Sequence, residues 1–105
     1  MKEALFVYGT LKDPEIQRAV FGRATAGTPA TLEGFIKSQL QLGKNMYPVI
    51  TSGEGAVEGV VLELTRKEMK NTDRYETDAY KRVKLILSNG REAWVYQKNE
   101  EKKKT

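Results

Sequence analysis

The sequence predicts a small α+β domain whose sheet bends or closes into a barrel, and three observations lead to this fold class. The chain has 105 residues, which suits one domain with one core. The expected elements run strand, helix, several strands, helix and hairpin, without the regular βαβ repeat of a doubly wound fold. Glycines recur within the expected strands, where they favour bends and bulges. We expect one domain over residues 1–97 and a charged, frayed tail over 98–105.

The first expected elements are a buried strand and a short helix. Residues 4–8, ALFVY, form an apolar run of strand type. Asp13 and Pro14 then offer an N-cap and a proline at the first helical position. The helix should end near Val20–Phe21, where Gly22 can form the C-cap.

The face that this helix buries can also be predicted. Ile16, Ala19 and Val20 have the i, i+3, i+4 spacing of one apolar stripe. We therefore expect these three side chains to face the core, with Gln17 and Arg18 in water.

The middle of the chain predicts extended structure with interruptions. Residues 23–42 contain short extended pieces, and bends or bulges are expected at Gly27, Pro29, Gly34 and Gly43. Residues 46–52 predict a strand or an extended loop. We expect a turn at 52-SGEG-55, followed by a long strand over residues 56–64.

The last third of the chain has two stronger local signals. Thr65-Arg66-Lys67-Glu68 matches the capping box, which predicts a polar helix from Arg66 to about Tyr75–Thr77. Residues 80–88 and 91–97 alternate in polarity on either side of Asn89-Gly90, which is the strongest short-range signal for a β-hairpin.

Composition excludes several kinds of chemistry. The chain has no Cys and no His, so disulfides, thiol nucleophiles, Ser-His-Asp triads and the usual zinc ligand sets are excluded. Any proton transfer must use Asp, Glu, Lys or Tyr. The apolar run near the N-terminus is too short for a signal peptide or a membrane span, so we expect a cytoplasmic protein without a membrane partner. The net charge of +4 comes partly from the tail and has acids among its bases, so we expect no specific nucleic-acid partner.

The first candidate site is 8-YGTL-11, between the expected strand and helix. One interpretation is an ordinary tight connection. In the other, Gly9 lets the backbone approach a ligand, and the N–H groups of Gly9 to Leu11 face an oxyanion or a carboxylate.

The second candidate is the acidic pair Asp73 and Glu76, which lie on one face of the expected helix. A neighbouring carboxylate and partial burial would raise the pKa of one of them, so that it could carry protons near neutral pH. Alternatively, the segment is a solvated helix end, and Arg74, Lys81 and Arg82 neutralise its acids.

The third candidate is an aromatic set that could line a pocket. Its members are Tyr8, Tyr47, Tyr75, Tyr80, Trp94 and Tyr96. For most of them we favour a place at the edge of the core with the polar group in water.

Taken together, these segments resemble the gamma-glutamylcyclotransferase-like family, which includes gamma-glutamylamine cyclotransferases and the plant avirulence-induced proteins. The resemblance covers residues 4–97, and its strength lies in the order of its pieces. These are 7-VYGTL-11, 21-FGRA-24, Gly43 with 47-YPVI-50, 57-VEGVVLEL-64, 73-DRYE-76, 80-YKR-82 and 93-AWVY-96.

The resemblance implies a small mixed α+β domain with a closed or nearly closed barrel, and the release of 5-oxoproline from a gamma-glutamyl amine or amide. It also implies site residues: Glu76 as general acid and base, Tyr8, Gly9, Thr10 and Leu11 for the glutamyl part of the substrate, and Tyr80 as a further pocket residue. Two positions depart from the family pattern, with Thr72 in place of Leu and Thr77 in place of Gly. They bear on substrate choice and on the burial of Glu76.

The implied reaction suits a chain without His or Cys. The substrate's own α-amino group attacks its γ-carbonyl, so neither a protein nucleophile, a metal nor a cofactor is needed. One carboxyl group can take the proton from the amine and return it to the leaving nitrogen. The main alternative is a non-catalytic module that binds a small molecule in the same pocket. A weak nucleic-acid binder, using the basic hairpin and tail, is a third hypothesis.

Overall fold

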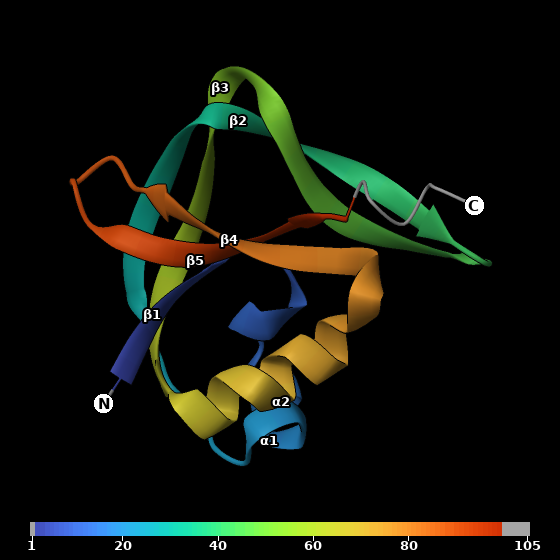
Figure 1. The fold of residues 1–105 in the computed structure, drawn as a ribbon, viewed down its shortest axis with the longest axis vertical. Coiled ribbons are helices and arrows are strands. Elements are labelled where there is room, and N and C mark those ends of the chain that lie inside the picture. Colours follow the sequence, from blue (N-terminus) through green and yellow to red (C-terminus); the bar gives the residue numbers. More distant parts are fainter. Residues whose placement is uncertain (1, 100–105) are drawn as a thin grey trace.

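The structure is a computed structural model that describes residues 2–99, and it contains one five-stranded sheet and two helices (Figure 1). The elements are β1 (Lys2–Val7), η1 (a 3₁₀ turn, Thr10–Lys12), α1 (Pro14–Phe21), β2 (Thr28–Leu42), β3 (Asn45–Thr65), α2 (Arg66–Glu76), η2 (a 3₁₀ turn, Thr77–Ala79), β4 (Tyr80–Ile86) and β5 (Glu92–Lys98).

The sheet is mixed and strongly curled, which confirms the predicted α+β class. Its strand order is β2-β3-β1-β5-β4, with β1 antiparallel to β3 and parallel to β5. Beyond the end of β4, the N–H of Ser88 donates to the carbonyl of Thr31 on β2 at 2.9 Å. The two edges of the sheet therefore meet at this point, and the sheet forms a half-barrel around the core (Figure 1).

The expected turn at residues 52–55 is wrong, because these residues lie inside β3. The chain reverses earlier, at Gly43 and Lys44, where Gly43 has a φ of 63°. Glu33 pairs with Ala56 and Phe35 with Ser52, so residues 53–55 form a bulge opposite a single residue of β2. A bulge bends a strand without ending it. It produces the sharp curvature of β2 and β3 in Figure 1.

The core has two layers because β1 alternates. Phe6 and Tyr8 face the inside of the curled sheet, whereas Leu5 and Val7 face the helices. The helix-facing layer also contains Leu11 from η1, Phe21 from α1 and Met69 from α2. Burial of these apolar side chains fixes η1 and both helices against one side of the sheet.

Helix α1 has the predicted caps, and its buried face matches the prediction only in part. The Asp13 side chain accepts a hydrogen bond from the N–H of Glu15 at 2.9 Å, and Gly22 has a φ of 88°. The buried residues are Gln17 and Phe21, so the expectation that Gln17 faces water is wrong. Ile16 and Val20 of the predicted stripe are partly buried and pack against the core, whereas Ala19 is exposed.

The C-terminal hairpin is confirmed, and it runs slightly further than predicted. Gly90 has a φ of 88° in the turn between β4 and β5. Lys98 is the last residue of β5, and the N–H of Asn99 donates to the carbonyl of Ala79 at 2.9 Å. Lys98, which we expected at the start of the tail, thus belongs to β5, and residues 100–105 of that tail lie outside the described part.

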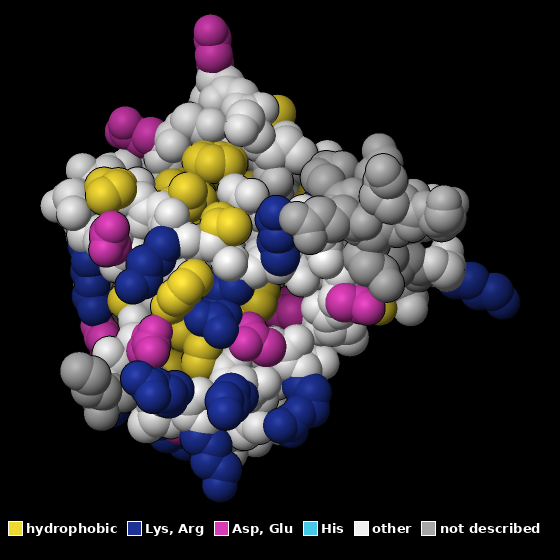
Figure 2. All heavy atoms as spheres, in the orientation of Figure 1, with side chains coloured by type: hydrophobic (Ala, Val, Ile, Leu, Met, Phe, Trp, Pro, Cys, Tyr) yellow, Lys and Arg dark blue, Asp and Glu magenta, His cyan; other side chains and the backbone are white. Residues whose placement is uncertain are grey.

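The surface mixes both signs of charge. On the face shown in Figure 2, Lys and Arg side chains gather toward the lower end, with Asp and Glu among them. Within residues 2–99, no helix has both the length and the apolar character needed to cross a membrane.

Candidate active site

A pocket of about 330 Å³ lies where η1, the end of α2 and strands β3, β4 and β5 come together. Every site residue predicted from the sequence lines this one pocket. They are Tyr8, Gly9, Thr10, Leu11, Glu76 and Tyr80. The structure thus brings together residues from the beginning and the end of the chain, and their roles stay predictions.

Glu76 is the last residue of α2, and its carboxyl group is partly buried in the pocket wall. No hydrogen bond or ion pair holds this carboxyl group within residues 2–99. Burial, followed by the negative charge of Asp73, raises the pKa of Glu76 from 4.5 to about 7. A group with this pKa can accept and donate a proton near neutral pH.

Asp73 behaves differently although it lies on the same helix. Arg82 donates two hydrogen bonds of 2.8 Å each to its carboxylate, and the Tyr96 hydroxyl donates a third. Burial opposes ionisation of Asp73, but the hydrogen bonds from Arg82 and Tyr96 outweigh it and lower the pKa of Asp73. The two interpretations of this acidic pair therefore combine, because Arg82 neutralises Asp73, whereas the Glu76 carboxyl group is unpaired within residues 2–99.

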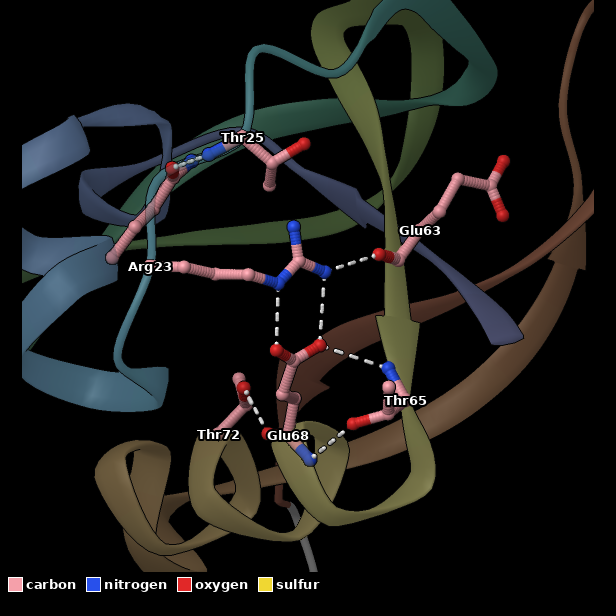
Figure 3. Close-up of polar contacts among 7 residues, drawn as sticks. Arg23, Thr25, Glu63, Thr65, Glu68 and Thr72 are labelled. Atoms are coloured by element: carbon pink, nitrogen blue, oxygen red, sulfur yellow. Dashed lines mark hydrogen bonds and ion pairs between the residues drawn. The ribbon is translucent and has the colours of Figure 1, made fainter. Parts of the chain in front are cut away.

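The start of α2 is fixed by the predicted capping box (Figure 3). The Thr65 hydroxyl accepts from the N–H of Glu68 at 3.1 Å, and the Glu68 carboxylate accepts from the N–H of Thr65 at 2.9 Å. Thr72 is buried, and its hydroxyl donates to the Glu68 carbonyl at 2.9 Å. The threonine in place of leucine is thus accommodated without an unsatisfied polar group.

Arg23 adds a second anchor that was not predicted. Its guanidinium donates to both carboxylate oxygens of Glu68, at 2.7 and 3.0 Å, and to the carbonyl of Glu63 at 2.9 Å (Figure 3). This bidentate pair ties the loop after α1 to α2 and β3. It helps to fix α2 against the sheet, and Glu76 is at the far end of that helix.

The segment 8–11 forms the tight turn of the first interpretation. The N–H of Lys12 donates to the carbonyl of Gly9 at 3.1 Å, which closes η1. A Cβ atom on Gly9 would lie 2.8 Å from Cγ of Pro48. Glycine therefore allows close contact with β3 here, a reason that neither interpretation of the sequence included.

The turn leaves donors for a ligand. Among residues 2–99 no acceptor is found for the backbone N–H groups of Gly9, Thr10 and Leu11. The buried side chain of Gln17 supports the turn. Its amide N–H donates to the carbonyl of Leu11 at 2.8 Å, and its amide oxygen accepts from the N–H of Thr25 at 2.7 Å. The free donors therefore sit on a supported backbone, as a binding site requires.

The tyrosines contribute more to the pocket than we expected from the sequence, which favoured a place at the edge of the core. Tyr8 donates to the carbonyl of Tyr96 at 2.6 Å, and Tyr80 donates to the carbonyl of Pro48 at 2.8 Å, so their hydroxyls bind protein and not water alone. Burial raises the pKa of Tyr80 to about 12 and that of Tyr8 further, which keeps both neutral. Only Trp94 of the aromatic set lies outside the pocket, with the guanidinium of Arg82 4.4 Å from its ring.

Several pocket residues were not predicted to bind substrate or to act in catalysis, although Tyr47, Tyr75 and Tyr96 belong to the aromatic set that could line a pocket. They are Phe6, Val7, Tyr47, Pro48, Tyr75, Thr77 and Tyr96. Tyr47 and Tyr75 are the more exposed ones, and the Tyr75 hydroxyl lies 2.9 Å from Oγ1 of Thr10. A signal was present for five of them, because Val7, Tyr47, Pro48, Tyr75 and Tyr96 lie in segments that carry the family resemblance.

Thr77 has unusual backbone geometry beside Glu76. With φ 61° and ψ −172°, it is the one non-glycine residue with positive φ within the described part of the chain. This region is used almost only by glycine, and a β-branched side chain there is strained. The family pattern has glycine at this position, so the departure in sequence has a visible cost in conformation.

The described residues offer no metal site, since residues 2–99 contain no group of three or more His, Cys, Asp or Glu side chains that could hold an ion. The ionisable groups that line the pocket are Glu76 and the tyrosines. The arrangement suits proton transfer by a carboxyl group next to free backbone donors.

Comparison with known proteins agrees with the resemblance seen in the sequence. The family model described as gamma-glutamyl cyclotransferase, AIG2-like, matches residues 5–105. AIG2-like protein B of Arabidopsis thaliana is 37% identical over 81 residues, which is 75% of this chain and 46% of that protein. AIG2-like protein C of the same plant is 35% identical over 89 residues, or 81% and 51% of the two chains. The chain spans about half the length of the curated relatives it matches.

Solved structures share the fold. A solution structure of one Arabidopsis thaliana protein has a TM-score of 0.80 at 27% identity, covering 94% of this chain and 63% of that one. A second, also from Arabidopsis thaliana, has a TM-score of 0.78 at 30% identity, covering 94% and 70%. A gamma-glutamyl cyclotransferase has a TM-score of 0.73 at 20% identity, covering 93% and 67%, and at that identity the likeness shows the fold alone.

Proposed function

The chain belongs to the gamma-glutamyl cyclotransferase, AIG2-like family, and from this we propose that its pocket releases 5-oxoproline from a gamma-glutamyl amine or amide. The observation that carries the proposal is the Glu76 carboxyl group, unpaired within residues 2–99 and with a pKa of about 7, in the same pocket as the free N–H groups of residues 9–11. A carboxyl group with a raised pKa beside a polar pocket is typical of a catalytic acid or base.

The reaction balances without a partner molecule. The α-nitrogen of the glutamyl group forms a bond to its own γ-carbonyl carbon, and the bond from that carbon to the leaving nitrogen breaks. Glu76 takes a proton from the attacking amine and gives it to the leaving nitrogen, so the enzyme returns to its starting state. Intramolecular attack in a well-oriented substrate corresponds to effective molarities of about 10⁵–10⁸ M.

The remaining groups of the pocket would bind and orient. The N–H groups of Gly9, Thr10 and Leu11 suit either the oxyanion of the tetrahedral intermediate or the substrate carboxylate. An oxyanion donor contributes about 10²–10³-fold to the rate. The aromatic rings of Tyr8 and Tyr80 form walls against which the glutamyl chain can fold into the attacking shape.

The experiment is a 5-oxoproline assay on purified protein with gamma-glutamyl amines, gamma-glutamyl dipeptides and epsilon-linked gamma-glutamyl-lysine. We expect turnover by the wild type and a loss of about 10²–10⁴-fold in Glu76→Gln, which keeps the size of the side chain but cannot transfer the proton. Glu54→Gln is the matched control, since Glu54 is exposed on the bulge of β3, away from the pocket.

Two results would overturn parts of this assignment. Full activity in Glu76→Gln would remove Glu76 from the catalytic step. A wild type that is inactive on the whole panel, yet stabilised against heat by one of these compounds, would identify a binding module in place of an enzyme.

A further inference from the structure

A cluster of three side chains lies directly behind the pocket wall. Asp73 accepts both hydrogen bonds of the Arg82 fork and a third from the Tyr96 hydroxyl. Neither Asp73 nor Arg82 lines the pocket, and both line a second hollow instead. Thr77, Tyr80 and Tyr96 line both hollows, so Asp73 and Arg82 lie behind these side chains, and Tyr96 connects the cluster to the pocket.

The cluster is held from several sides. The Arg82 guanidinium lies over the ring of Trp94 at 4.4 Å, and the indole N–H of Trp94 donates to the Glu3 carboxylate at 2.8 Å. Because the ring of Trp94 already restricts the guanidinium plane, Arg82 loses little conformational freedom when it pairs with the Asp73 carboxylate. Asp73 therefore keeps a defined position and stays ionised.

The cluster also reaches Glu76 through the backbone. The N–H of Thr77 donates to the carbonyl of Asp73 and so ends α2 directly after Glu76. The carbonyl of Tyr96 accepts the hydroxyl of Tyr8, which joins the cluster to the other wall of the pocket. Both walls are thus connected through Tyr96 on β5.

We propose that Asp73 and Arg82 are positioning residues for Glu76, and that together with Tyr96 they fix the last turn of α2 and keep one paired anion behind the pocket. The inference rests on the proposed role of Glu76. It adds residues that do not touch the substrate to those that do.

Asp73 and Arg82 carry opposite charges, so substitutions at the two positions should shift the pKa of Glu76 in opposite directions. The ionisable groups that line the pocket beside Glu76 are phenols. They are contributed by Tyr8 directly after β1, Tyr47 on β3, Tyr75 on α2, Tyr80 on β4 and Tyr96 on β5. The charged groups are Asp73 and, behind it, Arg82. Asp73 disfavours the ionised form of Glu76, and Arg82 partly cancels that effect.

The test follows the Glu76 carboxyl carbon by NMR in glutamate-labelled protein without substrate, with the signal assigned by its loss in Glu76→Gln. Asp73→Asn removes the anion and should lower the pKa of Glu76 by about half a pH unit or more. Arg82→Gln leaves the anion uncompensated and should raise it. Tyr96→Phe deletes one hydroxyl that donates a hydrogen bond to Asp73, and it should also raise the pKa of Glu76. This second variant keeps the test possible if Arg82→Gln does not fold.

Arg74→Gln is the matched control, because Arg74 is exposed on the same helix and pairs with Asn71 and not with Asp73. It should leave the titration of Glu76 close to that of the wild type. A cluster with a merely structural role would loosen the wall in each variant and move the pKa of Glu76 in the same direction in all of them. Shifts in one direction only, or no shift, would overturn the inference.

This titration needs no turnover, so it separates the two proposals. Opposite shifts in a protein that releases no 5-oxoproline would leave the positioning cluster standing and reject the cyclotransferase. In an active enzyme, the acid limb of the kcat/KM profile should move downward in Asp73→Asn and upward in Arg82→Gln.

Discussion

Thr77 leaves the helical conformation directly after Glu76. Glu76 has φ −75° and ψ −19°, which is helical, whereas Thr77 has φ 61° and ψ −172°. The helix therefore ends abruptly at the glutamate, and the strain of a β-branched residue with positive φ lies in the pocket wall. The strained backbone of Thr77 therefore lowers the stability of the fold directly beside Glu76, the proposed acid and base.

We expect Thr77→Gly to stabilise the protein by about 1 kcal/mol. Relief of the strained backbone is worth about 1–3 kcal/mol, and the extra freedom of glycine in the unfolded chain takes back about 0.5–1 kcal/mol. Urea unfolding measures the difference. Thr77→Ala keeps a Cβ atom at positive φ and should gain less, so a glycine variant that is less stable than the alanine variant would contradict the assigned strain.

The pKa of Glu76 predicts a pH-dependent stability. The folded-state pKa is raised from 4.5 to about 7, first by burial, so the folded protein favours the protonated carboxyl group. Its contribution is fully present below about pH 4.5 and is lost as the pH rises toward and through about 7. Glu76→Gln should therefore match the wild type at pH 4 and exceed it at pH 8, by about 1–3 kcal/mol after allowance for partial exposure.

Urea unfolding at several pH values tests this prediction. Glu54→Gln serves as the control, because Glu54 is exposed on the bulge of β3 and does not line the pocket. If the difference between Glu76→Gln and the wild type stayed constant between pH 4 and pH 8, the raised pKa would be wrong.

Much of the fold could be predicted because its signals are local. The caps of both helices and the Asn89-Gly90 hairpin depend on residues within a few positions of one another. The bulge at residues 53–55 depends on pairing with a distant strand, and Gly53 and Gly55 alone are equally compatible with a turn. Gln17 was misplaced for the same reason, since its partners, the backbones of Leu11 and Thr25, are set by tertiary packing.

The site was predictable only in part. The chemistry of the residues left two interpretations open for both Tyr8–Leu11 and Glu76, and the ordered family segments joined them into one pocket. Tyr47 and Tyr75 were candidates for lining a pocket, but the sequence carries no signal for the direction of their rings. The pairing of Asp73 with Arg82, and not with the adjacent Arg74, depends on how β4 lies against α2.

The contact between Gly9 and Pro48 gives a prediction for the pocket wall. A Cβ atom added in Gly9→Ala would lie 2.8 Å from Cγ of Pro48, which is closer than real Cβ contacts. Overpacking of this kind costs about 1–3 kcal/mol. We expect Gly9→Ala to lower the stability by that amount and to weaken substrate binding, because the turn that carries the free N–H groups must shift.

A double variant tests the cause of that loss. Combining Gly9→Ala with Pro48→Ala removes the ring atom that clashes with the new Cβ. The double variant should therefore be only slightly less stable than Pro48→Ala alone. Additive losses in the double variant would show that Gly9 is needed for a reason other than its contact with Pro48.

Glu68 has two separable tasks, which a pair of substitutions can distinguish. Its carboxylate completes the capping box with Thr65 and pairs with Arg23, whose side chain is 37% exposed against 14% for Glu68. Glu68→Gln keeps an acceptor for the Thr65 N–H and loses the ion pair, so it should cost about 0.5–1 kcal/mol. Glu68→Ala loses both and should cost about 1–2 kcal/mol.

The pH dependence of these costs separates the ion pair from the cap. The hydrogen bond from Arg23 is the largest cause that lowers the pKa of Glu68, so the ion pair stabilises the fold above the unfolded-state pKa of about 4.5 and is lost as the pH falls through the folded-state value. The cost of Glu68→Gln should therefore shrink in acid, whereas Glu68→Ala should keep the part that comes from the lost cap. Arg23→Gln should reproduce the first behaviour and not the second. A cost of Glu68→Gln that is the same at pH 7 and at pH 3 would mean that the pair with Arg23 adds nothing to the anchoring of α2, and the capping box alone would then fix the start of the helix that ends at Glu76.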